Sequence, residues 1–187
     1  MKLEIIIAST RPERLGDQVG TWIADFAKQH SDFEVEICDL AEINLPPLDE
    51  PLPPAMNQYT KDHTKAWATR IEAADAFIVV TPEYNLSMPP SLANAVDYLS
   101  REWKRKPIGF VGYGITGAIR AIQTEKLFFT TLNMMPIPYI VALNGVYKPA
   151  VQNVVIEAQH EKDATRLLTE LQIWAEALKA VRDKHPL

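Results

Sequence analysis

Apolar residues follow two periodicities along the chain, and their alternation predicts parallel strands separated by helices. Five short runs are strand-like: Lys2–Ala8, Glu34–Cys38, Ala76–Thr81, Ile108–Tyr113 and Pro138–Leu143. The first, third and fourth runs are almost continuously apolar, as expected for strands that are covered on both faces. The segments between and after the strands have apolar residues three and four positions apart, which predicts helices over Gly16–Lys28, Lys61–Ala74, Pro90–Arg101, Gly117–Leu132 and Glu161–Lys184.

Strands that alternate with helices indicate a doubly wound α/β domain, because each parallel strand needs a crossover to reach the next one. Right-handed crossovers leave few arrangements for five strands, and the flavodoxin-like order 2-1-3-4-5 is the natural one. We therefore expect a single three-layer domain over residues 1–187, with a five-stranded parallel sheet between two layers of helices. The proline-rich segment Asn44–Tyr59 has no periodicity and is expected to form a long surface loop.

Composition argues against several classes of function. The chain has 47% hydrophobic and 23% charged residues, which is typical of a globular protein. A formal net charge of −5 and the lack of a dense Lys/Arg tract argue against nucleic-acid binding. No apolar run approaches the ~18 residues of a membrane span, and the N-terminus does not resemble a signal peptide. We therefore expect a cytoplasmic protein without membrane contacts.

Cysteine and histidine usage predicts neither a disulfide nor a metal site. Cys38 is the only cysteine, and its strand-like surroundings indicate a small core residue. The four histidines are scattered and show no spacing typical of metal ligands: His30, His63, His160 and His185.

The segment after the first strand has the residues of an anion-binding loop. Residues 9–19 read Ser-Thr-Arg-Pro-Glu-Arg-Leu-Gly-Asp-Gln-Val and lead directly into the first helix. Free N–H groups and the positive end of the helix dipole point toward such a loop. Ser9, Arg11 and Arg14 add hydroxyl and guanidinium donors that suit a phosphate. A helix start with two solvated arginines is the alternative, and this loop alone supports both interpretations about equally.

Two further loops are expected at the same edge of the sheet, because ligands of this fold bind outside the carboxyl ends of the strands. The loop after the third strand can present backbone groups to a flat heterocycle, although by itself it is better explained as a surface turn. It reads Thr81-Pro82-Glu83-Tyr84-Asn85-Leu86-Ser87. The loop after the fourth strand fits G-x-G-x-x-G, and it reads Gly112-Tyr113-Gly114-Ile115-Thr116-Gly117. It does not follow the first strand, so we interpret its glycines as permitting close approach of a ligand rather than as a dinucleotide fingerprint.

Together the three loops resemble the NADPH-dependent FMN reductase family, which includes quinone, chromate and azo-dye reductases. The resemblance runs from Lys2 to about Pro138, and its most specific part is Thr81-Pro82-Glu83-Tyr84-Asn85 with Ser87, Pro89 and Leu92-Ala93-Asn94-Ala95-Val96-Asp97. The first loop is similar to the family's S-T-R-P-G-R-x-G-x-x-V pattern, with Glu13 in place of a glycine. Ala93 and Tyr98 stand where the family usually has lysine and tryptophan.

The resemblance implies FMN as cofactor, NADPH or NADH as cosubstrate and a small electron acceptor such as a quinone, with transfer by a ping-pong mechanism. The residues implied at the FMN phosphate are Ser9, Arg11, Arg14, Leu15 and Gly16. Those implied at the isoalloxazine are Pro82, Glu83, Tyr84 and Asn85 on one side and Gly112, Tyr113 and Gly114 on the other. No catalytic acid or base is expected, because the flavin carries the hydride chemistry; a loop-fixing role is expected for Glu83.

Two of the predicted helical segments indicate self-association. The segments Leu92–Arg101 and Ala118–Leu132 carry apolar residues around much of their circumference. A buried core also explains this pattern, but these helices form the dimer interface in the resembling family, so we expect a homodimer or homotetramer.

The alternatives to a reductase are a flavodoxin-type electron carrier and a non-catalytic redox-sensing FMN-binding protein. The paired arginines and the modest acidity favour the reductase over the electron carrier.

Overall fold

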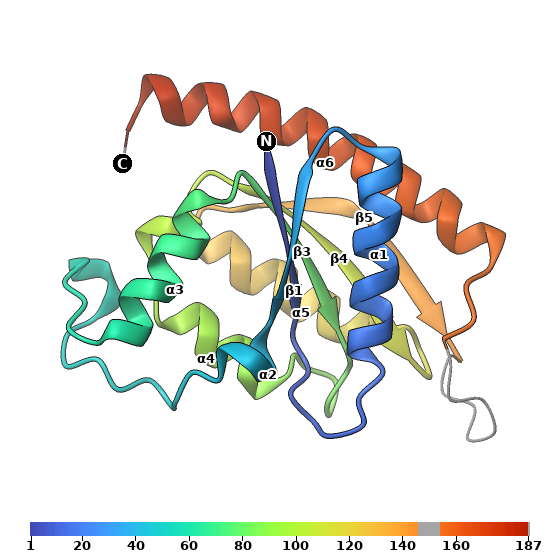
Figure 1. Ribbon diagram of the computed structural model, residues 1–187, viewed down its shortest axis with the longest axis horizontal. Helices are drawn as coiled ribbons and strands as arrows, with labels where there is room; N and C mark the ends of the chain where they lie inside the picture. The colour runs from blue at the N-terminus through green and yellow to red at the C-terminus, as the bar shows by residue number, and fades with distance from the viewer. Residues whose placement is uncertain (146–153, 187) are drawn as a thin grey trace.

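The strands form one parallel sheet with the order β2-β1-β3-β4-β5 in the computed structural model, which describes residues 1–145 and 154–186 (Figure 1). The strands are β1 (Lys2–Ile7), β2 (Glu34–Asp39), β3 (Ala76–Thr81), β4 (Pro107–Gly114) and β5 (Met135–Asn144). The predicted fold class and strand order are therefore confirmed. The expected single domain over residues 1–187 also includes 146–153 and 187, which lie outside the described residues.

Helices cover both faces of the sheet. One face packs against α1 (Gly16–His30) and α6 (Ala158–Lys184), and the other packs against α3 (Asp62–Ala73), α4 (Pro90–Asp97) and α5 (Ile119–Thr131). Three short elements that the periodicity did not predict join them: α2 (Leu40–Ile43) and the 3₁₀ turns η1 (Pro54–Met56) and η2 (Arg101–Trp103).

Alternation of side chains along the strands divides the core into two layers. Ile5 and Ile78 are fully buried on the side of α1 and α6. Their neighbours Ile6 and Val79 are buried on the side of α3, α4 and α5. Because successive strand residues point to opposite faces, a strand buried on both sides must be apolar at every position. The continuous apolar runs are explained in this way.

Most predicted elements differ from the structure by one to four residues at an end, and two of these differences have a clear physical cause. The helix predicted to run to Arg101 ends at Asp97, because the chain turns there and buries Tyr98 and Leu99 in the core. The fifth strand begins at Met135, three residues before its predicted start at Pro138. It pairs only with β4, and an edge strand tolerates prolines because their missing N–H groups can face away from the sheet.

The last helix packs its apolar stripe on the sheet along its first part and is held by ion pairs near its C-terminal end. Leu167 and Leu171 are buried against the sheet, but Val181 is 40% exposed near the C-terminal end of α6. There, Lys179 Nζ and Arg182 Nη2 donate to Asp75 Oδ1 at 3.0 and 2.8 Å. The stripe therefore contributes to the core only along the first part of α6.

The long loop over Asn44–Tyr59 is tied to α4. The amide of Asn94 donates to the Pro46 carbonyl at 2.8 Å and accepts from the Leu48 N–H at 2.9 Å. The Tyr98 hydroxyl also donates to the Pro46 carbonyl at 3.1 Å. This loop is a surface segment as predicted, and these bonds give it a defined course.

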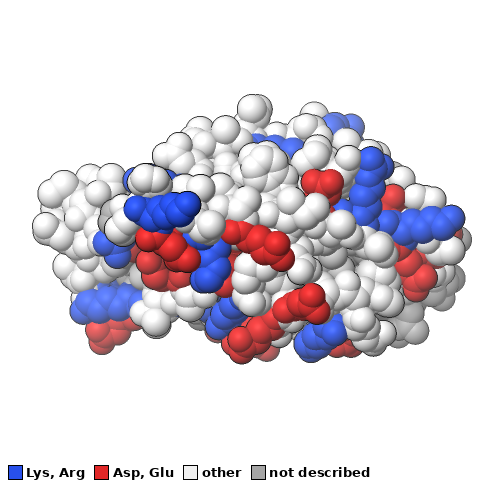
Figure 2. Space-filling model, turned by 90° about the horizontal axis from the view of Figure 1, so that it is seen from above, with Lys and Arg blue, Asp and Glu red and all other residues white. Residues whose placement is uncertain are grey.

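Surface charge is mixed on the face at the top of Figure 1. Figure 2 shows basic and acidic side chains interspersed there, without a large patch of one sign. No helix in the described part of the chain is long and apolar enough to cross a bilayer.

Candidate active site

The three predicted loops converge on a cavity of about 340 Å³ at the carboxyl ends of the strands. Its lining residues come from the loops after β1, β3 and β4 and from the start of α5: Arg11, Leu15, Pro82, Glu83, Tyr113, Gly114, Ile115, Thr116, Ala118 and Arg120. The position is the one expected for a doubly wound sheet, because the strand order reverses between β1 and β3.

The first loop contributes Arg11 to the cavity and Ser9 to its support. Ser9 is almost fully buried, and its Oγ shares a hydrogen bond of 2.9 Å with the Tyr84 hydroxyl. This bond joins the loop after β1 to the loop after β3. Leu15 lines the cavity directly before Gly16, the first residue of α1, so the free N–H groups of this helix start lie next to the cavity.

Tyr113 presents a buried hydroxyl at the cavity wall. The oxygen makes no hydrogen bond to any described residue, and burial raises the pKa of the phenol, which therefore stays protonated. A Cβ atom at Gly16 would come within 2.8 Å of this oxygen, so glycine gives the hydroxyl its space. A buried polar atom without a partner is a candidate donor to a ligand.

Glu83 holds the loop after β3 against the start of α5. Its Oε1 accepts from Arg120 Nε at 2.8 Å, and its Oε2 accepts from the Arg120 backbone N–H at 3.1 Å. These bonds to Arg120 lower the pKa of the Glu83 carboxyl. The carboxylate is thus ionised and engaged within the protein, as the loop-fixing hypothesis requires.

Asn85 lies at the tip of a tight turn and outside the cavity wall. Tyr84 and Ser87 exchange two backbone hydrogen bonds of 3.0 Å around it. Asn85 and Leu86 have φ values of 51° and 67°, which define a type I′ geometry. Asparagine tolerates this left-handed conformation better than leucine does, so the turn stores backbone strain at Leu86.

Two predicted site residues serve the protein's own packing. The Arg14 guanidinium forms a largely buried ion pair with Asp39 at the end of β2. A Cβ at Gly112 would collide with the carbonyl oxygen of Gly117, so the close approach that this glycine permits is to its own chain. Neither residue lines the cavity, although we predicted both as cofactor contacts.

Four lining residues were not predicted from the sequence as site residues: Ile115, Thr116, Ala118 and Arg120. They follow β4 directly, within and just after the glycine-rich loop. The position of this loop at the carboxyl end of a predicted strand was the signal that pointed to them.

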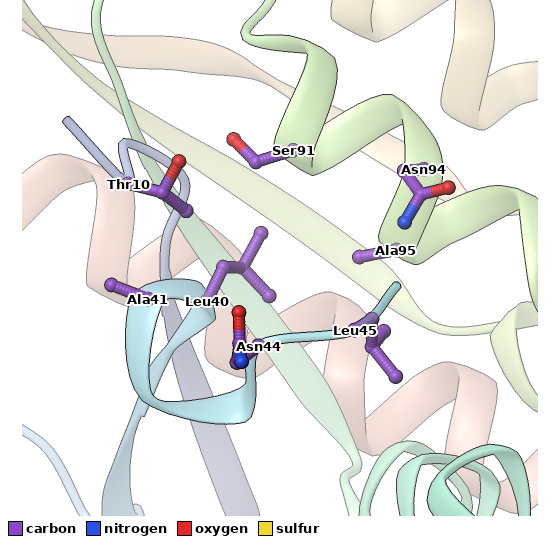
Figure 3. Close-up of a pocket in the computed structure, with 8 residues that line it drawn as sticks. All are labelled: Thr10, Leu40, Ala41, Asn44, Leu45, Ser91, Asn94 and Ala95. Atoms are coloured by element: carbon purple, nitrogen blue, oxygen red, sulfur yellow. The ribbon is translucent and has the colours of Figure 1, made fainter. Parts of the chain in front are cut away.

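A second cavity of about 310 Å³ lies between α2 and α4 (Figure 3). Thr10 borders this cavity, whereas its neighbour Arg11 lines the first one, so the loop after β1 separates the two. Two of its polar side chains are engaged within the chain. The Ser91 hydroxyl donates to the Ala8 carbonyl at 2.5 Å, and the Asn94 amide donates a hydrogen bond to the Pro46 carbonyl of the long loop. The first cavity is therefore the better candidate site.

Residues 1–148 match the family described as NADPH-dependent FMN reductase. The chain belongs to this family. An NAD(P)H-dependent FMN reductase of Schizosaccharomyces pombe is 38% identical over 156 residues, covering 82% of this chain and 78% of the relative. One from Nectria sp. is 33% identical over 191 residues, covering 91% and 95%. The flavoenzyme FerB of Paracoccus denitrificans shares the fold, with a TM-score of 0.68 over 96% of this chain and 97% of FerB at 22% identity.

This NADPH-dependent FMN reductase therefore uses FMN as cofactor and NADPH or NADH as electron donor. Its cavity fits that cofactor. Arg11 and the start of α1 supply donors for a phosphate, and the Tyr113 hydroxyl, which has no partner among the described residues, supplies one more. Apolar side chains such as Leu15, Pro82 and Ile115 line the rest of the wall and suit a flat aromatic ring.

Proposed function

We propose that this reductase passes electrons from NADPH or NADH through FMN to small acceptors such as quinones. The observation that carries the proposal is the cavity, in which phosphate donors and an apolar wall lie at one edge of the sheet. A 2-hydroxy-1,4-benzoquinone reductase of Burkholderia sp. supports the acceptor class, with 32% identity over 135 residues, 68% of each chain. An NADPH azoreductase of Bacillus sp. is 29% identical over 170 residues.

The residues of the cavity divide the work of holding the cofactor. Arg11 and the N–H groups at the start of α1 bind the phosphate, because a guanidinium and a helix start both favour an anion. Pro82 and Gly114 flank the ring from two different loops. The Tyr113 hydroxyl donates a hydrogen bond to a polar atom of the cofactor. It does not lose its proton, since burial raises the pKa of this phenol.

When bound, FMN supplies hydride acceptance and electron release. The protein orients the cofactor and leaves one side of the cavity open. Ile115 is 84% exposed at this side and offers an apolar surface to a nicotinamide or a quinone. Because one opening serves both substrates, the oxidised nucleotide leaves before the acceptor enters, which gives a ping-pong mechanism.

We also propose that the protein is a homodimer built on α5. Leu127 is 74% exposed, and Ile119 is exposed eight residues earlier on the same helix. Residues at this separation lie on similar sides of a helix. Ile119 is next in sequence to Ala118 and Arg120 of the cavity wall, so a second copy on this surface would lie near the cofactor.

Steady-state kinetics test the proposed reaction. The FMN-loaded protein is mixed with varied NADPH and varied 1,4-benzoquinone, and oxidation of NADPH is followed. Parallel lines in double-reciprocal plots are expected, and intersecting lines would overturn the shared opening. Free FMN at the same concentration is the control. A rate no higher than this control would overturn the proposed activity itself.

A further inference from the structure

Glu125 is a fully buried acid directly behind the cavity wall. It lies on α5 and is 0% exposed, and its Oε1 lies 2.6 Å from the Thr81 hydroxyl oxygen. Its other oxygen has no partner among the described residues. Thr81 is also fully buried, at the last position of β3, and precedes the cavity residue Pro82.

The distances leave one proton to be shared by two acceptors if Glu125 is ionised. The Thr81 hydroxyl oxygen lies 2.6 Å from Glu125 Oε1 and 3.0 Å from the Pro82 carbonyl oxygen. A hydroxyl donates only one hydrogen bond. If the Thr81 hydroxyl donates to an ionised Glu125, the Pro82 carbonyl oxygen faces a lone pair of the hydroxyl instead of its hydrogen. The second carboxylate oxygen of Glu125 then stays buried and charged without a donor among the described residues. Such an arrangement is costly in the protein interior.

A neutral Glu125 resolves the conflict. Its carboxyl O–H then donates to the Thr81 oxygen, and the Thr81 O–H donates to the Pro82 carbonyl, so every hydrogen has an acceptor. Burial agrees with this arrangement, because it raises the pKa of Glu125 to about 7. Among the described residues, the Thr81 hydroxyl is the group that acts against this rise.

We propose that Glu125 is a positioning residue that, as a neutral acid, directs the Thr81 hydroxyl proton to the Pro82 carbonyl and thereby fixes the cavity wall. In a trans peptide, the carbonyl and the following N–H point in opposite directions. An anchored Pro82 carbonyl therefore also fixes the direction of the Glu83 N–H. This N–H has no acceptor among the described residues and lies in the loop that lines the cavity. The link to FMN rests on the proposed function.

Four variants separate this role from simple packing, with the FMN dissociation constant as readout. Thr81→Val removes the hydroxyl at nearly constant volume and is expected to weaken FMN binding about fivefold, whereas Thr81→Ser retains the affinity. Glu125→Gln keeps a donor toward Thr81 and is expected to bind FMN within about twofold of the unmodified protein. Glu125→Leu removes the donor and is expected to weaken binding about threefold.

Glu125→Gln as weak as Thr81→Val would overturn the proposal, and so would Glu125→Leu with unchanged affinity. Urea unfolding of each apoprotein identifies variants that fail to fold. A purely structural role for Glu125 predicts lower stability in Glu125→Leu with no change in FMN affinity, which also counts against the proposal.

Infrared spectroscopy tests the protonation of Glu125 without FMN, so this test is independent of the proposed function. At pH 6 the apoprotein should show the carbonyl band of a protonated carboxyl that is missing from the Glu125→Gln spectrum. If the two spectra show no such difference, Glu125 is ionised and the inference is wrong. If the band is present but the unmodified protein does not bind FMN, the fault lies in the proposed function.

Discussion

Arg14 and Asp39 form an ion pair that ties the loop after β1 to the end of β2. Both side chains are largely buried. Asp39 also accepts a hydrogen bond of 2.9 Å from the Ala41 N–H, so its carboxylate caps α2 as well. Arg11 lines the cavity while Arg14 braces the loop, and the two arginines therefore have different expected roles.

Arg11→Ala is expected to weaken FMN binding on the order of tenfold or more, because a charged hydrogen bond to phosphate contributes about 1.5–3 kcal/mol. Fluorescence titration of the apoprotein with FMN measures this change. Arg11→Lys keeps the charge but loses the fork of donors and is expected to give an intermediate affinity. Unchanged affinity in Arg11→Ala would show that the phosphate binds elsewhere.

Arg14→Ala is expected to act mainly on stability. It leaves the Asp39 carboxylate largely buried without its cation, which costs about 1–3 kcal/mol of unfolding free energy. Asp39→Asn keeps the acceptor for Ala41 and removes the charge, so it is the matched control and should cost less. Urea unfolding of the three proteins measures both effects. A loss of FMN affinity in Arg14→Ala as large as in Arg11→Ala would contradict this division of roles.

Glu125 is expected to make the folded protein less stable as pH rises. Its folded pKa of about 7 lies above its ordinary value of 4.5. Between these values the unfolded chain releases a proton that the folded protein keeps, so the free energy of unfolding falls with pH. The full effect is about 3 kcal/mol, and it is complete above the folded pKa.

Glu125→Gln removes this titration. The difference in unfolding free energy between the variant and the unmodified protein should therefore grow in favour of the variant from pH 5 to pH 8. Urea unfolding of both apoproteins at several pH values gives this difference. If the unfolding free energies of the two proteins change in parallel from pH 5 to pH 8, Glu125 has an ordinary pKa in the folded protein.

Gly112→Ala is expected to lower the unfolding free energy by about 2 kcal/mol or more, because its new methyl group would meet the Gly117 backbone. Gly114→Ala is the matched control in the same loop. Apart from its chain neighbours, no atom of the described residues lies within 4 Å of its Cβ position, so the expected cost is a φ of 122° that alanine adopts poorly. Thermal unfolding measures the loss of stability in Gly112→Ala and in Gly114→Ala. Equal effects would show that the packing against Gly117 is not what requires glycine at 112.

Leu127→Glu is expected to dissociate the proposed dimer, because it places a charge in the apolar surface of α5. Light scattering should give twice 21.1 kDa for the unmodified protein and 21.1 kDa for the variant. Ile173→Glu on α6 makes the same change at a residue that is 55% exposed, and it should leave the mass unchanged. A mass of one chain for the unmodified protein at micromolar concentration would refute the dimer.

Local pattern predicted the fold because the signals lie within single elements. Continuous apolar runs such as Ala76–Thr81 indicate buried parallel strands, and handed crossovers then leave few strand orders. The same reasoning began the fifth strand at Pro138 and missed its first residues, 135–137, since a proline such as Pro136 counts against a strand unless the strand lies at an edge. Whether a strand lies at an edge is a property of the whole sheet.

The sequence by itself determined that three loops meet at the carboxyl edge of the sheet, and the resemblance of these loops to a known family implied FMN. Only the tertiary structure decided which side chains face the cavity. Arg14 meets Asp39 across 25 positions and Thr81 meets Glu125 across 44. A motif lists residue types along the chain, but the direction of a side chain depends on partners that folding brings from other elements. For this reason Arg11 and Arg14, three residues apart in one motif, have different surroundings.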